Sequence, residues 1–190
     1  MFDSVVFDLD GTLWDTCATC ALGWNTVLRR HGIAFRDITV DDIRGVTGRP
    51  HEQCIQEVFR GLPDHQLALL ATETATEDVR LVAEIGGTLY PGVEDGLAQL
   101  ASRLPLFIVS NCQAGYIETF LTWSGMGRHF RDVECWGNTG LSKAANLARI
   151  IDRNGLRAPV LVGDTPGDQS AARECAVPFL FADWGFGQCH

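Results

Sequence analysis

Two aspartates stand two residues apart near the start of the chain, in the stretch VVFDLDGTLWDT. The apolar residues 5–7 predict a buried strand that ends as Asp8 and Asp10 arrive. Residues two apart on a strand point to the same face, so both carboxylates can serve one site as metal ligand, nucleophile or proton carrier. Gly11 then permits a sharp backbone turn. Since Asp, Gly and Thr are also common turn residues, this stretch alone is also compatible with a polar turn.

Polar residues end two further apolar runs. FIVSN places Ser110 and Asn111 at the end of one predicted strand, and VLVGDTPGD places Asp164 at the end of another, with Asp168 four residues later. In an α/β sheet, ligands bind at the carboxyl ends of the strands. Each segment alone also fits a turn or a helix start, but their order and their shared position favour one common site.

Lys143 is the only lysine of the chain, and every other cationic side chain is an arginine. It follows Ser142, a residue type that favours helix caps, and so falls in the first turn of a predicted helix. A cation there opposes the helix dipole unless an anion such as phosphate lies beside it. A compact ammonium also fits where the planar fork of arginine does not. The alternative is a solvated surface charge.

The remaining pattern predicts an α/β fold with one insertion. From residue 105 onward, short apolar runs alternate with helical patterns, which indicates a parallel sheet covered by helices. Between residues 15 and 86 no convincing strand is visible, and apolar residues recur at helical spacing. We therefore expect a core domain from residues 1–14 and 87–190, interrupted by an all-helical domain at 15–86.

Three apolar stripes mark the helices expected in the insertion. The first covers residues 17–31 and ends at Gly32, and the second covers residues 54–62. Pro63 and Asp64 then introduce a longer third helix that reaches Ile85.

Composition indicates which partners and which cellular compartment to expect for this protein. The chain has 190 residues, 46% of them hydrophobic, and a net charge of −9. That charge argues against nucleic acid or an anionic membrane as the main partner. Seven cysteines form no paired framework, the start is acidic and the apolar runs are short, so we expect a cytoplasmic protein with reduced thiols. The sequence does not indicate an oligomeric state.

The motifs DLDGTL, VSN, SKAAN and GDTPGD resemble, in this order, those of the haloacid dehalogenase superfamily. YPGV and the terminal WGFG resemble segments of its phosphoglycolate phosphatase-like branch. The resemblance covers essentially the whole chain. It implies a Rossmann-like doubly wound parallel sheet, with the strand of Asp8 in its centre and a small helical cap inserted after that strand. Many relatives have proline directly after the lysine, where this chain has Ala144, which bears on the subfamily only.

This resemblance implies that the protein is expected to be a Mg²⁺-dependent phosphatase of a small phosphorylated metabolite. Asp8 is expected to attack phosphorus, and Asp10 to protonate the leaving oxygen and then activate water. The expected metal ligands are the side chains of Asp8 and Asp164 and the main-chain carbonyl of Asp10, with Asp168 in an outer or water-mediated role. The residues expected to contact the substrate are Leu9, Gly11, Thr12, Arg49, Ser110, Asn111 and Lys143.

The same residues distinguish a phosphatase from proteins with related activities. Dehalogenases of the superfamily lack an acid two residues after the nucleophile, where this chain has Asp10. Sugar phosphomutases typically lack the acid that Asp168 supplies, so hydrolysis is favoured over phosphate transfer. A receiver-type signalling domain also uses a phosphorylated aspartate, but its acceptor follows the third strand and it has no cap. A binding scaffold without activity is disfavoured because no motif position is lost.

The loop predicted at residues 44–54 is the best candidate for contacting the substrate from the cap. Gly45, Gly48 and Pro50 interrupt the helical pattern there, and Arg49 is expected to bind a carboxylate or second phosphate. A surface role for Arg49 remains the alternative. Phosphoglycolate, sugar phosphates, nucleoside monophosphates and pyrophosphate all remain possible substrates.

Other side chains allow two interpretations each. Trp14 either closes one wall of the pocket or packs at the junction of core and cap. Cys112, beside the second motif, is a candidate for redox sensitivity. A zinc site is suggested by the spacing of four residues, but the cysteines among them lie on apolar stripes, which favours buried thiols. These four are Cys17, Cys20, His51 and Cys54.

Overall fold

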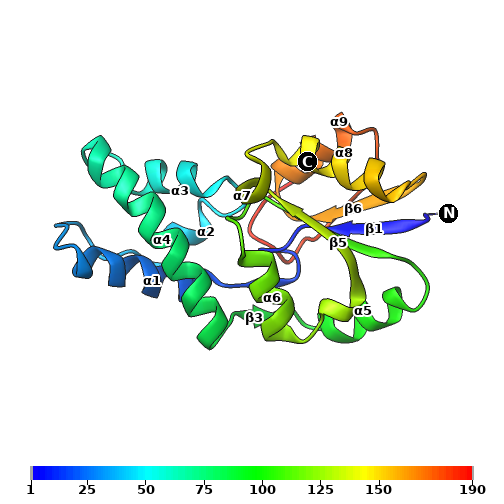
Figure 1. Cartoon of the computed structure of the whole chain (residues 1–190), viewed down its shortest axis with the longest axis horizontal. Helices are drawn as coiled ribbons and strands as arrows, with labels where there is room; N and C mark the ends of the chain where they lie inside the picture. Colours follow the sequence, from blue (N-terminus) through cyan, green and yellow to red (C-terminus); the bar gives the residue numbers. More distant parts are fainter. Residues whose placement is uncertain (1, 190) are drawn as a thin grey trace.

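A computed structural model describes residues 2–189 of the chain (Figure 1). Its main sheet has five parallel strands in the order β5-β4-β1-β6-β7, with the strand that precedes Asp8 in the centre. This confirms the predicted doubly wound α/β fold. The strands are β1 (Ser4–Phe7), β4 (Leu106–Ser110), β5 (Phe130–Cys135), β6 (Pro159–Gly163) and β7 (Phe179–Phe181).

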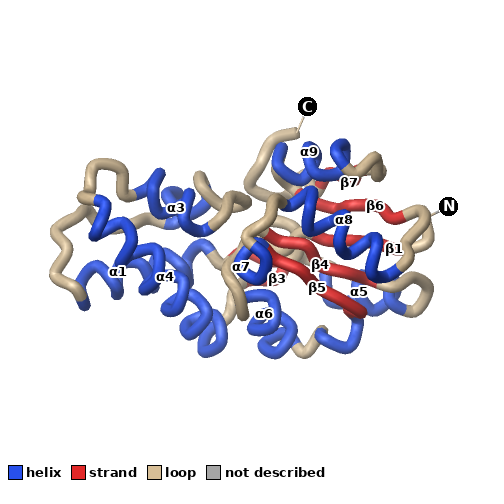
Figure 2. The backbone as a smooth tube through the Cα atoms, turned by 45° about the horizontal axis from the view of Figure 1, so that its top comes forward, coloured by secondary structure: helices blue, strands red, loops and turns tan. Residues whose placement is uncertain are grey.

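Helices cover both faces of this sheet, α8 and α9 on one and α5 and α6 on the other (Figures 1 and 2). The alternation along β1 explains the two layers, because Val5 and Phe7 pack with one set of helices and Val6 with the other. The helices are α5 (Val93–Ala101), α6 (Tyr116–Ser124), α7 (Trp136–Thr139), α8 (Lys143–Asn154) and α9 (Pro166–Glu174), with a short 3₁₀ turn at Gly127–His129.

Four helices between the first strand and the rest of the sheet form a separate bundle beyond the strand ends (Figure 2). They are α1 (Cys17–Arg30), α2 (Val40–Arg44), α3 (His51–Val58) and α4 (Asp64–Ile85). They enclose a second hydrophobic cluster that includes Trp24, Ile55 and Phe59. Two short strands, β2 (Trp14–Asp15) and β3 (Thr88–Leu89), pair where the chain leaves and re-enters the core. None of the helices described combines the length and hydropathy that crossing a membrane requires.

The bundle differs from the sequence-based expectation in two places. The second stripe was expected to span residues 54–62, but α3 ends at Val58, because Gly61 takes a positive φ of 99° and Pro63 follows. The expected loop 44–54 is shorter, since Arg44 closes α2 and His51 opens α3. The short helix α2 was not predicted; a capping box between Thr39 and Asp42 stabilises it.

The bundle also buries an acid that the sequence analysis did not single out. Asp78 on α4 is 2% exposed, and its Oδ2 accepts a hydrogen bond from Trp24 Nε1 at 3.1 Å. Its Oδ1 has no hydrogen-bond partner among the residues described. Burial raises the pKa of Asp78 to about 8, although the Trp24 bond opposes the rise. The carboxyl group is therefore neutral at pH 7.

We expect Asp78→Asn to stabilise the fold at pH 8 and to have little effect at pH 4. The folded-state pKa lies above that of the unfolded chain, so stability present at low pH is lost as the pH rises toward 8. The gain in unfolding free energy at pH 8 should exceed about 1.4 kcal/mol, the worth of one pKa unit. Urea unfolding at both pH values measures it, with Asp37→Asn as the exposed control. A variant destabilised at both pH values would contradict a neutral Asp78.

Candidate active site

The carboxyl ends of three central strands bring the predicted polar residues to one edge of the sheet. Asp8 follows β1, Ser110 ends β4 and Asp164 follows β6, and all three are buried. They lie side by side because β1 pairs in parallel with both β4 and β6. Gly11 has a φ of 85°, and a Cβ there would lie 2.3 Å from Asp164 Oδ2. Only glycine lets the turn after β1 pass this close to Asp164.

Lys143 opens α8, and its buried ammonium group joins two of the acids. Nζ lies 2.5 Å from Asp8 Oδ1 and also bonds to Asp168 Oδ1. The residue is 6% exposed, so the alternative of a solvated surface charge is wrong. Burial alone would lower the Lys143 pKa, but the charges of Asp168 and Asp8 raise it above its ordinary value. The ammonium group is therefore charged at neutral pH.

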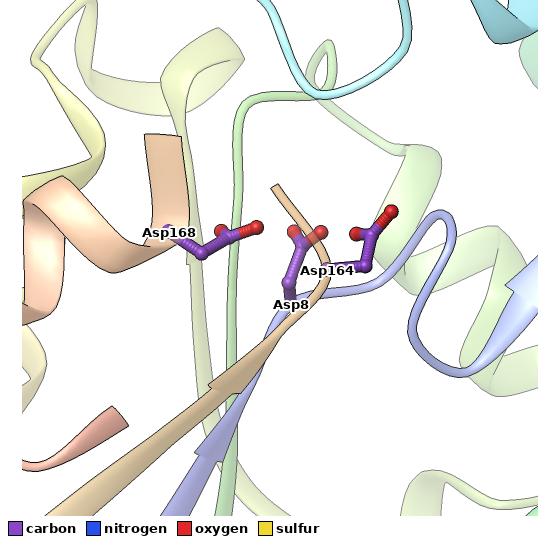
Figure 3. Close-up of side chains that lie close together, drawn as sticks. All are labelled: Asp8, Asp164 and Asp168. Atoms are coloured by element: carbon purple, nitrogen blue, oxygen red, sulfur yellow. The ribbon is translucent and has the colours of Figure 1, made fainter. Parts of the chain in front are cut away.

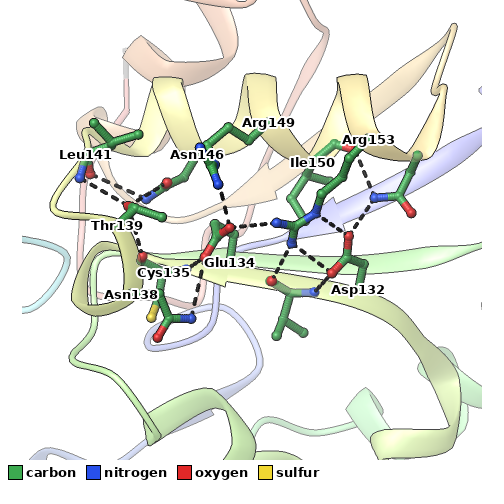
Figure 4. Close-up of polar contacts among 12 residues, drawn as sticks. Asp132, Glu134, Cys135, Asn138, Thr139, Leu141, Asn146, Arg149, Ile150 and Arg153 are labelled. Carbon is green, nitrogen blue, oxygen red and sulfur yellow. Dashed lines mark hydrogen bonds and ion pairs between the residues drawn. The ribbon is translucent and has the colours of Figure 1, made fainter.

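A polar network between β5 and α8 fixes the start of the helix that carries Lys143 (Figure 4). Buried Glu134 accepts from Arg153 Nη1 at 2.7 Å, which ties the strand to the far part of the helix. Thr139 Oγ1 donates to Asn146 Oδ1 at 2.8 Å, and the Ser142 hydroxyl caps the first turn. Both the connecting segment and the helix are thus held in place, which restricts where the Lys143 side chain can reach.

Three buried carboxylates lie close together at the strand ends (Figure 3), and Lys143 bonds to two of them. One oxygen from each of Asp8, Asp164 and Asp168 lies within 4.8 Å of the others. Burial raises the pKa of Asp8, the charges of Asp168 and Asp164 raise it further, and Lys143 opposes them. One ammonium group cannot balance three carboxylates, so a divalent cation would relieve the repulsion. Mg²⁺ suits this donor set, because it prefers oxygen ligands and needs only a few from the protein.

Asp168 is already held on both sides. Its Oδ1 accepts from Lys143, and its Oδ2 accepts from Thr165 N at 2.9 Å and Thr165 Oγ1 at 2.6 Å. The Thr165 contacts form the capping box that begins α9. With both oxygens engaged, Asp168 is suited to orienting Lys143 more than to binding a metal directly.

Asp10 lies apart from the carboxylate cluster, in polar surroundings of its own. Its Oδ1 accepts from Tyr116 Oη at 3.0 Å and from Thr16 Oγ1 at 3.1 Å. Burial raises the Asp10 pKa to about 6, although the Tyr116 and Thr16 bonds oppose the rise. A carboxyl group poised there can exchange a proton near neutral pH. Tyr116 and Thr16 were missed in the sequence because they lie in ordinary helical and turn patterns.

The segment after β4 binds both the core and the cap. Ser110 Oγ accepts from Cys112 N at 3.3 Å. Asn111 Nδ2 donates to Gly48 O at 2.8 Å, across 63 residues of sequence. The Asn111 amide nitrogen is therefore engaged by the cap loop. At the other side of the site, Leu9 is fully buried and Thr12 Oγ1 lies 3.4 Å from Asp164 Oδ1.

One cavity runs from the strand ends into the helical bundle. On the core side, Asp8, Asp10 and Ser110 line it; on the cap side, Arg49 and Asp78 do. The Arg49 side chain is exposed and has no ion-pair partner among residues 2–189. The structure thus brings Arg49 to the same cavity as Asp8, with a cationic group left free for a ligand.

Trp14 is fully buried in the core and packs against Tyr116, Phe120 and Trp123. Of the two interpretations of Trp14, these contacts favour a packing role over a wall of the pocket.

Two of the four residues considered for a zinc site have other partners. Cys54 Sγ bonds to the carbonyl of Val46 at 3.3 Å, and His51 Nε2 lies 2.8 Å from Thr74 Oγ1. Burial raises the pKa of the Cys17 and Cys54 thiols, which favours the protonated form.

Comparison with known proteins identifies relatives of this chain. The chain is 31% identical to a phosphoglycolate phosphatase of Synechococcus elongatus over 191 residues, which covers 96% of this chain and 84% of that protein. It is 28% identical to a phosphoglycolate phosphatase of Agrobacterium fabrum, covering 95% and 80%.

Solved structures share the fold. The haloacid dehalogenase-like protein SP0104 from Streptococcus pneumoniae superposes with a TM-score of 0.84 at 23% identity, covering 98% of this chain and 87% of that one. CbbY from Rhodobacter sphaeroides, solved with phosphate, gives 0.83 at 17% identity, covering 100% and 90%. The family model for haloacid dehalogenase-like hydrolases matches residues 5–182. This protein therefore belongs to the haloacid dehalogenase-like hydrolases.

Proposed function

We propose that this protein is a Mg²⁺-dependent phosphatase that hydrolyses a small phosphate monoester through an aspartyl-phosphate on Asp8. The observation that carries the proposal is the buried contact between Asp8 and Lys143 beside Asp164, with Asp10 held separately at a raised pKa. Two relatives named above are phosphoglycolate phosphatases, so phosphoglycolate is the first substrate to test.

The acidic cluster would hold the metal. We assign the side chains of Asp8 and Asp164 and the main-chain carbonyl of Asp10 as ligands, with Asp168 acting through Lys143 or water. When bound, Mg²⁺ supplies positive charge that lets a carboxylate approach a phosphate group of about −1.5 to −2 charge.

Hydrolysis then proceeds in two displacements. An Asp8 oxygen bonds to phosphorus as the bond to the leaving oxygen breaks, and Asp10 gives its proton to that oxygen. In the second displacement Asp10 takes a proton from the water that attacks the phosphorus of phospho-Asp8, which frees phosphate and restores both acids. Lys143, the Ser110 hydroxyl and the amides near Leu9 would hold the phosphoryl oxygens throughout.

Residues 15–86 would act as a cap over a core of residues 1–14 and 87–190. One contact between the two parts supports this division of labour: Asn111 of the core donates to the carbonyl of Gly48 in the cap. This bond lies between the helical bundle and the strand ends, where it can hold the bundle over the cavity. The seven free thiols suit the reducing cytoplasm.

A phosphate-release assay over a panel of metabolites, with and without Mg²⁺, tests the proposal. Phosphoglycolate, sugar phosphates, nucleoside monophosphates and pyrophosphate form the panel. We expect Mg²⁺-dependent release from at least one small monoester. No release from any of them at saturating Mg²⁺ would refute the proposed function.

Asp10→Asn should slow hydrolysis most for substrates with poor leaving groups, because asparagine cannot donate the proton that an alkoxide needs. We expect kcat/KM to fall about 10²- to 10⁴-fold for an alkyl phosphate and much less for 4-nitrophenyl phosphate. Rates for a series of aryl and alkyl phosphates measure this slope. A loss independent of leaving-group pKa would exclude Asp10 as the general acid.

Arg49→Ala should weaken binding of a substrate with a second anionic group by about 1.5 to 3 kcal/mol, as expected for a hydrogen bond to a charged group. An aryl phosphate has no second anion, so its kcat/KM should change less than about threefold. Steady-state kinetics on both substrates, with Arg60→Ala as an exposed control in the cap, measures the difference. Equal losses on both substrates would mean that Arg49 serves cap closure and not recognition.

A further inference from the structure

The segment that follows β7 runs back over the strand ends and contacts the candidate site with its backbone. In Figure 1 this red segment lies at the end of the sheet that faces the cap helices. Phe186 N donates to Asp164 Oδ2 at 2.7 Å, and Gly187 N to the same oxygen at 3.3 Å. Trp184 Nε1 donates to Thr12 O at 3.1 Å, in the turn after β1. Two elements of the site are thus held by a segment outside the four motifs.

At its two glycines, the segment lies too close to the site for a side chain to fit. A Cβ on Gly185 would lie 2.3 Å from Asp164 Cβ and 2.5 Å from Gly11 O. A Cβ on Gly187 would lie 2.3 Å from Asp164 O and 2.9 Å from Thr165 Cα. Backbone atoms and the buried side chain of Asp164 line this contact, so alanine at either position must displace the segment or Asp164.

The side chain of Phe186 points to the other domain. It packs against the hydrophobic cluster of the helical bundle, and the Arg44 guanidinium lies 5.7 Å from its ring centre. Arg44 in turn pairs with Asp15, where the chain leaves the core. One residue therefore holds Asp164 through its amide and contacts the cap through its ring.

We infer that residues 184–187 are a positioning segment that couples the cap to Asp164: the cap seats Phe186, and the amides of Phe186 and Gly187 then fix the Asp164 carboxylate. Asp164 Oδ2 is engaged by both amides, whereas the one hydrogen bond to Oδ1 from residues 2–189 is the long 3.4 Å contact of Thr12. Oδ1 is thereby left for a cation. The inference rests on the proposed metal site and adds to it a means by which cap position sets metal affinity.

Calorimetric titration of Mg²⁺ into the metal-free protein, without substrate, tests the positioning. Residues that orient a metal ligand typically change affinity about 10- to 100-fold when altered, and we expect a loss in that range for Gly185→Ala. Gly96→Ala is the matched control, since a Cβ there meets no atom within 4 Å. Phe186→Ala, which keeps the amide but loses the cap contact, should weaken binding at least about threefold, and Phe186→Leu should restore most of it.

The coupling must also act in reverse, because linkage is reciprocal. Mg²⁺ should slow amide hydrogen exchange in the cap loop at residues 45–50 of the wild type, and should do so less in Phe186→Ala. Phe186 variants remain informative if Gly185→Ala fails to fold. Wild-type affinity in the folded Phe186→Ala and Gly185→Ala variants would overturn the positioning role alone. A wild type that binds no Mg²⁺ would overturn the proposed metal site and the coupling with it.

Discussion

Replacing Asp8 by asparagine should lower Mg²⁺-dependent phosphate release by at least about 10⁴-fold, the scale on which loss of a nucleophile acts. The amide keeps the shape of the side chain but cannot form the acyl phosphate, and it removes one charge from the metal cluster. Asp8 is 2% exposed, and its Oδ1 contacts Lys143 Nζ. Steady-state turnover and acid-quench trapping of the phosphoenzyme measure the effect together.

The fold should survive this change. Burial and two neighbouring carboxylates already raise the Asp8 pKa, so a neutral side chain relieves repulsion in the metal-free protein. The melting temperature of Asp8→Asn should therefore equal or exceed that of the wild type, and Asp37→Asn provides an exposed control of the same chemistry. Turnover within about tenfold of the wild type in a folded variant would refute the aspartyl-phosphate mechanism.

The centre of the sheet was predictable because three of its strands are short apolar runs that end in a polar motif. Asp8 follows β1, Ser110 is the last residue of β4, and Asp164 follows β6. Parallel pairing then leaves those residues at one edge, so spacing along the chain was enough to predict their proximity. Lys143 was predictable for a similar reason, since a lone lysine at a helix start needs an anion.

Other features of the site depend on tertiary contacts that no local pattern encodes. Tyr116 reaches Asp10 from one helix, and Asp78 reaches the cavity from another. The Asp164 partners are backbone amides of Phe186 and Gly187, which carry no side-chain signal at all. The cap loop was placed correctly around Gly48, but its length was overestimated because the short helices α2 and α3 take up its ends.

Lys143→Met should destabilise the metal-free protein by about 3 to 5 kcal/mol at neutral pH, as expected when one partner of a buried ionic cluster is removed. Methionine keeps the length of the side chain but leaves Asp8 and Asp168 without their shared cation. Urea unfolding measures the loss. Turnover should also fall about 10²- to 10³-fold, the effect of removing one group that stabilises transition-state charge.

The pH dependence identifies the cause of that loss. Lys143 opposes the rise in the Asp8 pKa, so its removal lifts the pKa further above the value in the unfolded chain. Stability from such an acid is present at low pH and is lost as the pH rises, so the deficit of the Met variant should be largest above pH 7 and smallest near pH 4.

Saturating Mg²⁺ should recover part of the lost stability, because a second cation then balances the carboxylates. Lys143→Arg keeps the charge and should lose less stability than the Met variant while remaining slow, since its planar fork does not match the space of an ammonium group. A deficit that is the same at pH 4 and pH 8 would show that lost packing, not unbalanced charge, explains the role of Lys143 in the fold.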